Sequence, residues 1–273
     1  MSNEGFSQYL EPVVSLSEQA AHAILEIYNT DFDVEHKKDN TPLTKADMAA
    51  HRIIVDGLKK LTPEVPVLSE ESAAIPFEQR QQWSRYWLVD PLDGTREFIK
   101  RNGEFTVNIA LIDENYPVLG VIYVPVTGVC YYAAEGKGAY KIDENKQRQS
   151  INSRSIDLQQ LVVAGSRSHF NDRLTPVFAD LPDYELIPMG SSLKSCLVAE
   201  GKADIYPRLG PTSEWDTGAA QAIVEAAGGR LTNLNIERLP YNTKSSLLNP
   251  EFIVIGDESF DWGKYFKPLF QQP

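Results

Sequence analysis

The sequence predicts a mixed α/β protein, in which residues 1–155 form a lobe around an antiparallel sheet and residues 156–273 form a smaller α/β lobe of one compact unit. Three β-rich runs in the first lobe are separated by only a few residues, at 105–113, 118–124 and 129–134. Short gaps between strands favour antiparallel pairing. In the second lobe, strand-like and helix-like runs alternate, which is typical of an α/β unit. The pattern changes near 150–160, where we place the lobe boundary.

Two amphipathic helices should open the chain. Residues 7–30 place a set of apolar side chains near helical spacing, namely Leu10, Val13, Val14, Ala20, Ala21, Ile24, Ile27 and Tyr28. The polar stretch 31–43 is typical of a loop. A second helix over 45–61 should turn three side chains inward, those of Ile54, Leu58 and Leu61.

Two short strands should follow, each ending at a carboxylate. Pro66-Val67-Leu68 predicts a strand that ends at Glu70 and Glu71, and Trp87-Leu88-Val89 predicts one that ends at Asp90. The antiparallel meander comes next and should end at Gly136-Lys137-Gly138. In the second lobe, strands are expected at 161–164, 184–188, 203–206 and 252–255, and helices at 171–180, 190–201, 217–227 and 260–270.

Charge and composition exclude several functional classes. The chain of 273 residues has a formal net charge of −12, which repels nucleic acid and anionic membranes. No apolar run approaches the roughly 18 residues of a membrane span, so we expect no integral membrane segment. Cys130 and Cys196 form no CxxC pair, and the N-terminus shows no signal-peptide pattern. Two buried free thiols in a reducing cytoplasm are therefore expected.

The most informative segment is 87–95, Trp-Leu-Val-Asp-Pro-Leu-Asp-Gly-Thr. Asp90 and Asp93 stand where a buried strand should stop. Pro91 interrupts the strand and Gly94 permits a tight turn, so both carboxylates can point into one space. Hard cations such as Mg²⁺ take oxygen ligands of this kind. The alternative interpretation is a local Asx turn with a helix cap.

The same turn offers further groups to a metal and an anion. The Leu92 carbonyl, freed by the turn, can be a ligand, and N–H groups near Gly94 and Thr95 can face a phosphate. On so acidic a chain, an anionic substrate needs local positive charge, which a divalent metal bound by carboxylates can supply.

Other acidic residues have simple alternative explanations when taken singly. Glu70 and Glu71 are typical of a solvated acidic loop. Asp47 fits the first turn of a helix, where it interacts with the helix dipole. Asp216 precedes an apolar helix and fits an N-cap. Because a carboxylate has two oxygens, capping and metal ligation are compatible.

Together these motifs resemble the inositol monophosphatase superfamily of metal-dependent, lithium-sensitive phosphatases, over essentially the whole chain. Segment 87–95 is similar to its first signature, and Trp215-Asp216 with the helix through Gly228-Gly229 is similar to its second. Ser69-Glu70-Glu71-Ser72 resembles the segment with its upstream metal ligand, and Thr44-Lys45-Ala46-Asp47 the segment with its early aspartate. The resemblance implies a layered αβαβα sandwich of the sugar-phosphatase type.

Within the superfamily, residues 93–110 resemble the bacterial 3′(2′),5′-bisphosphate nucleotidases. Inositol phosphatases usually carry Asn-Phe where this chain has Glu97-Phe98, and they lack its Lys-Arg-Asn-Gly-Glu run at 100–104. The resemblance implies hydrolysis of 3′-phosphoadenosine 5′-phosphate to AMP and phosphate, and action on its 5′-phosphosulfate relative, in sulfur assimilation. The alternatives are an inositol or sugar monophosphatase with the same metal site, and a non-catalytic phospho-ligand binder.

The resemblance also implies a set of metal ligands. Glu70, Asp90 and the Leu92 carbonyl would hold one Mg²⁺, and Asp90, Asp93 and Asp216 would hold a second. A third, weaker site would form near Glu70, and Mn²⁺ would substitute for Mg²⁺. Two metals about 3.5–4 Å apart can clamp the entering and leaving oxygens of an in-line displacement. Lithium should inhibit by replacing a catalytic magnesium.

The resemblance assigns water activation to Asp47 and Thr95, beside Glu70, with no covalent phosphoenzyme. The implied substrate contacts are Glu70, Asp93, Gly94, Thr95, Arg96, His169, Ser191, Lys194, Arg208 and Asp216. Lys194 and Arg208 would read the 5′-phosphate. Taken singly, Ser191 and Lys194 fit a helix start, and Arg208 a solvated strand end. His169 fits an ordinary loop histidine. A homo-oligomer and a peripheral association with the inner membrane are left open, although the charge of −12 argues against electrostatic attachment.

Overall fold

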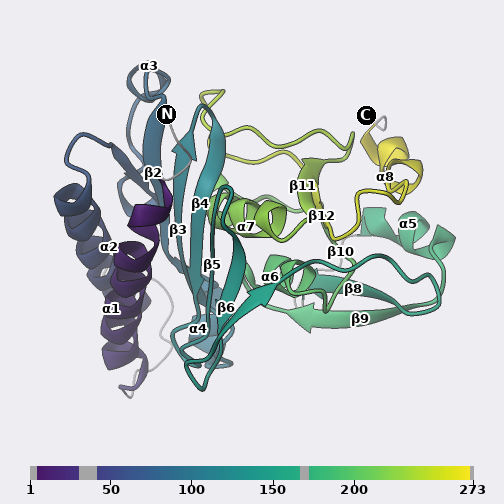
Figure 1. The fold of residues 1–273 in the computed structure, drawn as a ribbon, viewed down its shortest axis with the longest axis horizontal. Coiled ribbons are helices and arrows are strands. Elements are labelled where there is room, and N and C mark those ends of the chain that lie inside the picture. The colour runs from purple at the N-terminus through teal and green to yellow at the C-terminus, as the bar shows by residue number, and fades with distance from the viewer. Residues whose placement is uncertain (1–4, 31–41, 167–171, 271–273) are drawn as a thin grey trace.

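The computed structural model describes residues 5–30, 42–166 and 172–270, which form five layers (Figure 1). Two helices cover the outer face of a first sheet, two helices lie between this sheet and a second one, and further helices cover the far side of the second sheet. The αβαβα sandwich expected from the sequence is therefore confirmed. None of the described helices is long and apolar enough to cross a membrane.

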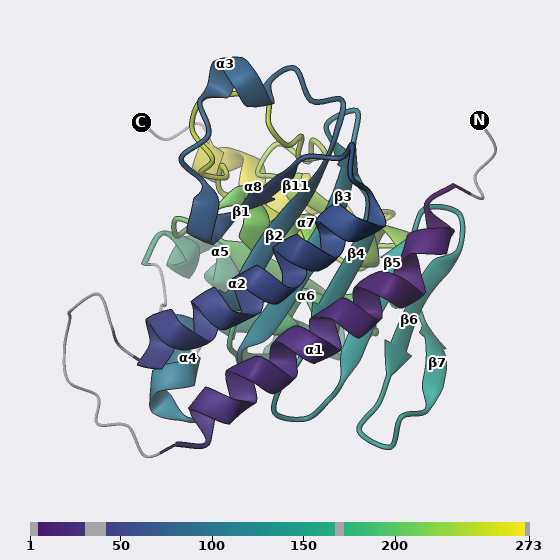
Figure 2. The same ribbon diagram turned by 90° about the vertical axis from the view of Figure 1, so that its left-hand side faces the viewer.

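The outer helices are α1, Leu10–Tyr28, which a short 3₁₀ turn precedes, and α2, Pro42–Leu61. They lie side by side across the first sheet (Figure 2). Each buries one face, as its apolar spacing predicts: Ile24 of α1 and Ile54 and Leu58 of α2 are fully buried against that sheet.

Within the described residues, the first sheet has seven strands in chain order. They are β1 Val67–Ser69, β2 Arg85–Asp93, β3 Thr106–Asp113, β4 Tyr116–Tyr123, β5 Cys130–Ala134, β6 Gly138–Ile142 and β7 Arg148–Ile151. β1 is parallel to β2, and the other neighbours are antiparallel. The short helices η2 Glu70–Ser72, α3 Phe77–Arg80 and α4 Thr95–Lys100 interrupt this sequence.

The sheet corrects two predictions. The meander does not end at 136–138, because Gly136 and Gly138 take positive φ angles and turn the chain back into β6 and then β7. β2 does not stop at Asp90 but continues to Asp93, with a shift in its register to β3 between these two residues. The irregularity lies at Pro91, which has no N–H to donate to a ladder.

The second sheet has the order β11-β12-β10-β8-β9. Its strands are β8 Leu161–Ser166, β9 Tyr184–Met189, β10 Ile205–Arg208, β11 Arg230–Asn233 and β12 Phe252–Ile255. β8 is parallel to β9 and β10, whereas β12 is antiparallel to β10 and β11. β11 was not expected, because its four residues, Arg-Leu-Thr-Asn, contain only one strongly apolar side chain.

The helices between the sheets are α6, Leu193–Ala199, and α7, Glu214–Ala226. α7 lies so close to β4 that a Cβ on Gly120 would come within 2.3 Å of the Ala219 carbonyl oxygen. Beyond the second sheet, 3₁₀ helix η3 Asp172–Leu174 leads into α5 Thr175–Asp180, and α8 is Gly263–Phe270. The chain passes from one sheet to the other between Ile151 and Leu161; a division into lobes at 155 stays a prediction.

Candidate active site

Three carboxylates meet where the end of β2 faces the first turn of α7. Asp90, Asp93 and Asp216 each offer one oxygen, and these oxygens lie within 4.8 Å of one another. Asp90 is 1% exposed. Carboxylate oxygens gathered at this spacing fit a hard divalent cation, which neutralises charges that would otherwise repel.

The turn after Asp90 uses only part of that carboxylate. The Leu92 N–H donates to Asp90 Oδ1 at 3.0 Å, so the local Asx-type bond considered from the sequence is present. Asp90 also lies beside the carboxyls of Glu70 and Asp216. The turn therefore orients Asp90 inward, toward the other acidic groups.

Asp216 is not the N-cap of its helix. α7 begins at Glu214 with Ser213 as its N-cap, and Asp216 occupies the third helical position of a capping box. Its Oδ2 accepts the Ser213 N–H at 2.8 Å. The N-cap of α7 thus lies three residues before Asp216, the residue for which the sequence suggested this role. Capping and metal binding remain compatible, because one Asp216 oxygen accepts the Ser213 N–H and the other can face a cation.

Asp93 is held by the residue that directly precedes α6. Its Oδ2 accepts the backbone N–H of Ser192 at 2.7 Å and the Ser192 hydroxyl at 2.8 Å. Sequence reasoning overlooked Ser192, which it treated only as part of a helix start.

A second acidic group lies beside the first. Asp47 on α2 hydrogen-bonds Glu71, and its Oδ1 is buried without a partner. Burial, the charge of Glu71 and the proximity of Glu70 raise the pKa of Asp47 to about 8. Glu70 as a whole is exposed, but its carboxyl is largely buried. This burial, followed by the negative charges of Glu71 and Asp93, raises the pKa of Glu70 to about 7.

The same physics governs the inner carboxylates. Burial, followed by the charges of Asp93, Glu70 and Asp216, holds the pKa of Asp90 well above its usual range. Burial and the charge of Asp93 raise the pKa of Asp216 to about 7. Burial first, and mutual repulsion second, thus disfavour the charged form of each of these carboxyls, and a bound divalent cation would offset both effects.

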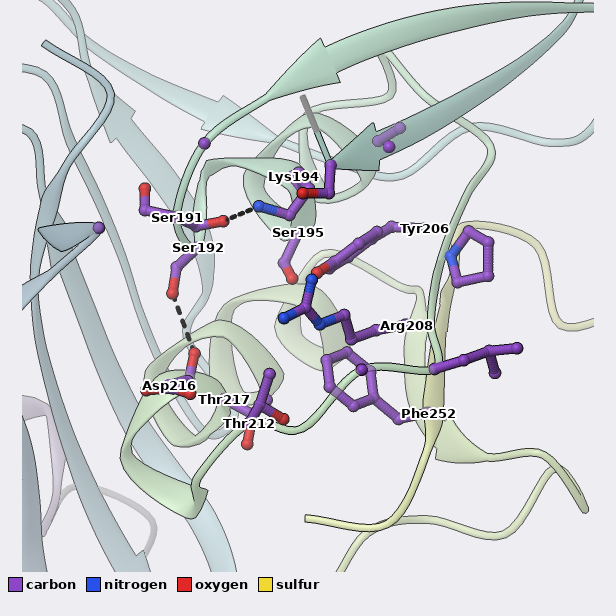
Figure 3. Close-up of a pocket in the computed structure, with 18 of the residues that line it drawn as sticks. Ser191, Ser192, Lys194, Ser195, Tyr206, Arg208, Thr212, Asp216, Thr217 and Phe252 are labelled. Carbon is purple, nitrogen blue, oxygen red and sulfur yellow. Dashed lines mark hydrogen bonds between the residues drawn. The ribbon is translucent and has the colours of Figure 1, made fainter. Parts of the chain in front are cut away.

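A cleft of about 770 Å³ opens beside the carboxylates and is lined by residues of α4, α6 and the strands β8 to β10 (Figure 3). Its volume suits a small organic ligand. At one end lie Asp93, Asp216 and the start of α4, and along it lie Ser191, Lys194 and Arg208. Its apolar lining comes from side chains of the second lobe, among them Leu174, Phe178, Leu186 and Phe252.

The Ser-x-x-Lys element forms one wall of the cleft. Ser191 has a positive φ of 41°, and its Oγ is buried without a partner. The Lys194 ammonium donates to the Ser191 carbonyl at 2.5 Å and to the Met189 carbonyl at 3.3 Å, and lies 5.3 Å from the centre of the Tyr206 ring. Burial lowers the pKa of Lys194 to about 8, against the opposing effect of Asp93.

The remaining predicted residues are placed as follows. Gly94 has a φ of 99° and precedes Thr95, the first residue of α4; both line the cleft with Arg96. In the part of the chain that the structure describes, no hydrogen bond joins Thr95 to Asp47. Arg208 donates weakly to the Pro211 carbonyl at 3.4 Å, and its Nε is buried without a partner. His169 lies outside the described residues.

Besides Ser192, the structure adds two buried polar residues on β3, Thr106 and Asn108, which connect to Ser192. A signal for them exists in the sequence, because Thr-Val-Asn-Ile-Ala places polar residues inside an otherwise apolar strand. A third addition is Glu104, whose Oε2 accepts the Gly190 N–H at 2.8 Å.

Comparison with known proteins identifies close relatives. The model of the inositol monophosphatase family matches residues 7–256. The 3′(2′),5′-bisphosphate nucleotidase CysQ of Salmonella typhimurium is 52% identical over 247 residues, which cover 90% of this chain and 98% of that protein. The protein of the same name from Escherichia coli K12 is 51% identical with the same coverage.

Solved structures agree. CysQ from Bacteroides thetaiotaomicron, a bacterial member of the inositol monophosphatase family, superposes with a TM-score of 0.82 at 42% identity, over 93% of this chain and 98% of that one. An inositol monophosphatase from Zymomonas mobilis gives a TM-score of 0.78 at 24% identity, over 96% and 99%. At that identity the likeness shows the fold alone.

Proposed function

The chain belongs to the inositol monophosphatase family, and from that premise we propose that it is a magnesium-dependent 3′(2′),5′-bisphosphate nucleotidase. Its substrate would be 3′-phosphoadenosine 5′-phosphate, from which it removes the 3′-phosphate to leave AMP. The 5′-phosphosulfate relative would be a second substrate. The names of the relatives described above support this choice.

One structural observation carries the proposal: a single cleft joins the carboxylate cage of Asp90, Asp93 and Asp216 to cationic side chains and an apolar wall. The cationic side chains are the buried Lys194 and the half-buried Arg208. A nucleotide bisphosphate has matching parts. The phosphate to be removed would lie beside the cage and the loop from Asp93 to Arg96. The 5′-phosphate would meet Lys194 and Arg208, and the base would rest on the apolar lining near Phe252. An inositol monophosphate lacks the second anion and the flat base.

The carboxylates would hold two Mg²⁺ ions. Glu70, Asp90 and the Leu92 carbonyl are proposed for the first, and Asp90, Asp93 and Asp216 for the second. A third, weaker site is proposed near Glu70, and Mn²⁺ would replace Mg²⁺. Bound Mg²⁺ would supply positive charge that stabilises the phosphoryl oxygens and favours ionisation of the attacking water.

Side chains and backbone groups of the protein would accept the proton of the attacking water and bind the phosphate. The Thr95 hydroxyl at the cleft would accept a hydrogen bond from the attacking water and pass its proton to the Asp47 carboxylate, whose Oδ1 has no other partner. Gly94, in the left-handed conformation, would let the backbone approach the phosphate closely. The unpartnered Ser191 hydroxyl would donate to the substrate, with His169 as a further contact.

The proposal includes a cytoplasmic location, because Cys130 and Cys196 are buried free thiols. Peripheral attachment to the inner membrane would need a contact other than net charge. Cell fractionation checks both. Inhibition by millimolar Li⁺ is also expected, and full activity in its presence would contradict the proposed second metal site.

A phosphate-release panel tests the proposed function. The purified chain with Mg²⁺ is supplied in turn with 3′-phosphoadenosine 5′-phosphate, its phosphosulfate relative, inositol 1-phosphate and NADP. The highest kcat/KM is expected for the first. Preference for inositol 1-phosphate would replace the nucleotidase by an inositol phosphatase. Tight nucleotide binding with no phosphate release at any Mg²⁺ concentration would indicate a non-catalytic binder.

A further inference from the structure

A series of buried, hydrogen-bonded polar side chains leads from β3 through Ser192 to Asp93 at the end of β2. The Thr106 hydroxyl donates to Asn108 Oδ1 at 2.9 Å, and Asn108 Nδ2 donates to Ser192 Oγ at 2.9 Å. Ser192 then contacts Asp93 Oδ2 through its hydroxyl at 2.8 Å and its N–H at 2.7 Å. Thr106, Asn108 and Ser192 are all buried.

The donors and acceptors of this chain have a definite direction. Because Thr106 donates to the amide oxygen of Asn108, the amide nitrogen must face Ser192. Ser192 Oγ therefore accepts a hydrogen bond, and its single proton is left for Asp93 Oδ2 or for the Asp216 carbonyl oxygen, which lies 2.9 Å away. Both possible acceptors belong to residues of the carboxylate cage (Figure 3 shows the contact with Asp216).

We propose that Ser192 is a positioning residue, which occupies Oδ2 of Asp93 and thereby turns Oδ1 toward the metal, while tying β2 to the first turn of α7. The inference rests on the proposed metal site. Oδ2 already faces the two Ser192 donors, and Asn108 Nδ2 lies 3.5 Å from it. The oxygen left for a cation is Oδ1, and its direction is set by Ser192 and Asn108, which come from separate elements.

The position of Ser192 also links metal and nucleotide. It directly follows Ser191, a residue that lines the cleft, and it stands at the N-terminal cap position of α6, which carries Lys194. If substrate binding moves the loop that carries Ser191 and Ser192, the hydrogen bonds from Ser192 would therefore move Asp93 directly. Groups that orient a metal ligand typically affect metal affinity or activity by about 10- to 100-fold.

The test measures metal affinity without turnover. Free Mn²⁺ is titrated against the full chain and followed by electron paramagnetic resonance, with no substrate present. Ser192→Ala should bind Mn²⁺ roughly 10- to 100-fold more weakly than wild type. Asn108→Ala, which keeps both Ser192 donors but removes the amide that orients the Ser192 hydroxyl, should weaken binding by about 5-fold, the value of one neutral hydrogen bond.

Ser17→Ala is the matched control. Ser17 is also fully buried, and its hydroxyl donates to the Val14 carbonyl at 2.7 Å on α1, across the first sheet from the cage. This variant should keep wild-type Mn²⁺ affinity. With phosphate release as a second readout, Ser192→Ala should need proportionally more Mg²⁺ for half-maximal rate and recover kcat at saturating Mg²⁺.

Wild-type Mn²⁺ affinity in folded Ser192→Ala would overturn the inference. Should that variant not fold, the same result in Asn108→Ala would overturn it. The outcome is separable from the proposed function, because a wild-type chain that binds Mn²⁺ but releases no phosphate from the bisphosphate would refute only the nucleotidase activity.

Discussion

Glu104 and Gly190 join the segment between α4 and β3 to the loop before α6. Glu104 Oε2 accepts the Gly190 N–H at 2.8 Å, and a Cβ on Gly190 would lie 2.8 Å from the Glu104 carbonyl oxygen and 2.9 Å from its Cβ. The Glu97 Cγ would be closer still, at 2.6 Å. The loop that carries Ser191 is therefore packed too closely against Glu97 and Glu104 to accept a side chain at position 190.

Gly190→Ala should displace this loop. We expect an increase in KM for the nucleotide and a loss of about 1–3 kcal/mol in the free energy of unfolding, which is usual for overpacking. Steady-state kinetics and urea denaturation check both. Gly256→Ala is the control, since its added Cβ would meet neighbours only at 3.4–3.6 Å. Equal kinetics for wild type and Gly190→Ala would mean that the cleft does not depend on this close approach.

Asp93→Asn should separate catalysis from folding. The amide oxygen can still accept the Ser192 donors, but the group that faces the cation loses its charge. Activity should fall by at least about 100-fold, while the melting temperature without metal should stay level or rise, because one like charge leaves the cluster. Phosphate release and thermal melting in EDTA are the measurements. Substantial activity would remove Asp93 from the metal site.

Lys194→Met should distinguish recognition of the 5′-phosphate from support of the loop. A lost charge-assisted hydrogen bond should cost roughly 10- to 100-fold in kcat/KM for 3′-phosphoadenosine 5′-phosphate. The loss for 3′-AMP, which has no 5′-phosphate, should be much smaller. If both substrates lose equally, Lys194 acts through its bonds to the Met189 and Ser191 carbonyls instead.

The stability of the metal-free protein should fall as pH rises. The folded-state pKa values are about 8 for Asp47 and about 7 for Glu70 and Asp216, whereas unfolded carboxyls titrate near pH 4, roughly. Between about pH 4 and pH 8, the folded state therefore binds more protons than the unfolded state, and the free energy of unfolding decreases with pH.

Thermal melting in EDTA at about pH 5 and about pH 8 measures this effect, and the lower Tm is expected at the higher pH. Added Mg²⁺ should raise Tm more at the higher pH, because it need not displace protons there. A Tm in EDTA that rises over this interval would show that these carboxyls are not buried together.

Local patterns predicted the elements around the site well. The apolar spacing of α1 and α2, the three central strands of the meander and the alternation in the second lobe are all confirmed. Asp90 and Asp93 could be recognised as candidate metal ligands because both lie in one contiguous segment of the sequence. The errors lie where the local signal is weak. β6 and β7 follow glycines that are equally compatible with a tight turn and with the end of the sheet. β11 has almost no apolar pattern.

By itself, the sequence determined the type of chemistry, because the residue types at 87–95 and 215–216 suffice to indicate oxygen ligands for a hard cation. Only the tertiary structure decided which oxygens of these carboxylates already accept hydrogen bonds from the protein. Asp216 gives one to Ser213, and Asp93 gives one to Ser192, a residue distant in sequence. Spacing along a chain cannot predict such bonds, since they form only when separate elements pack and bury their polar groups together.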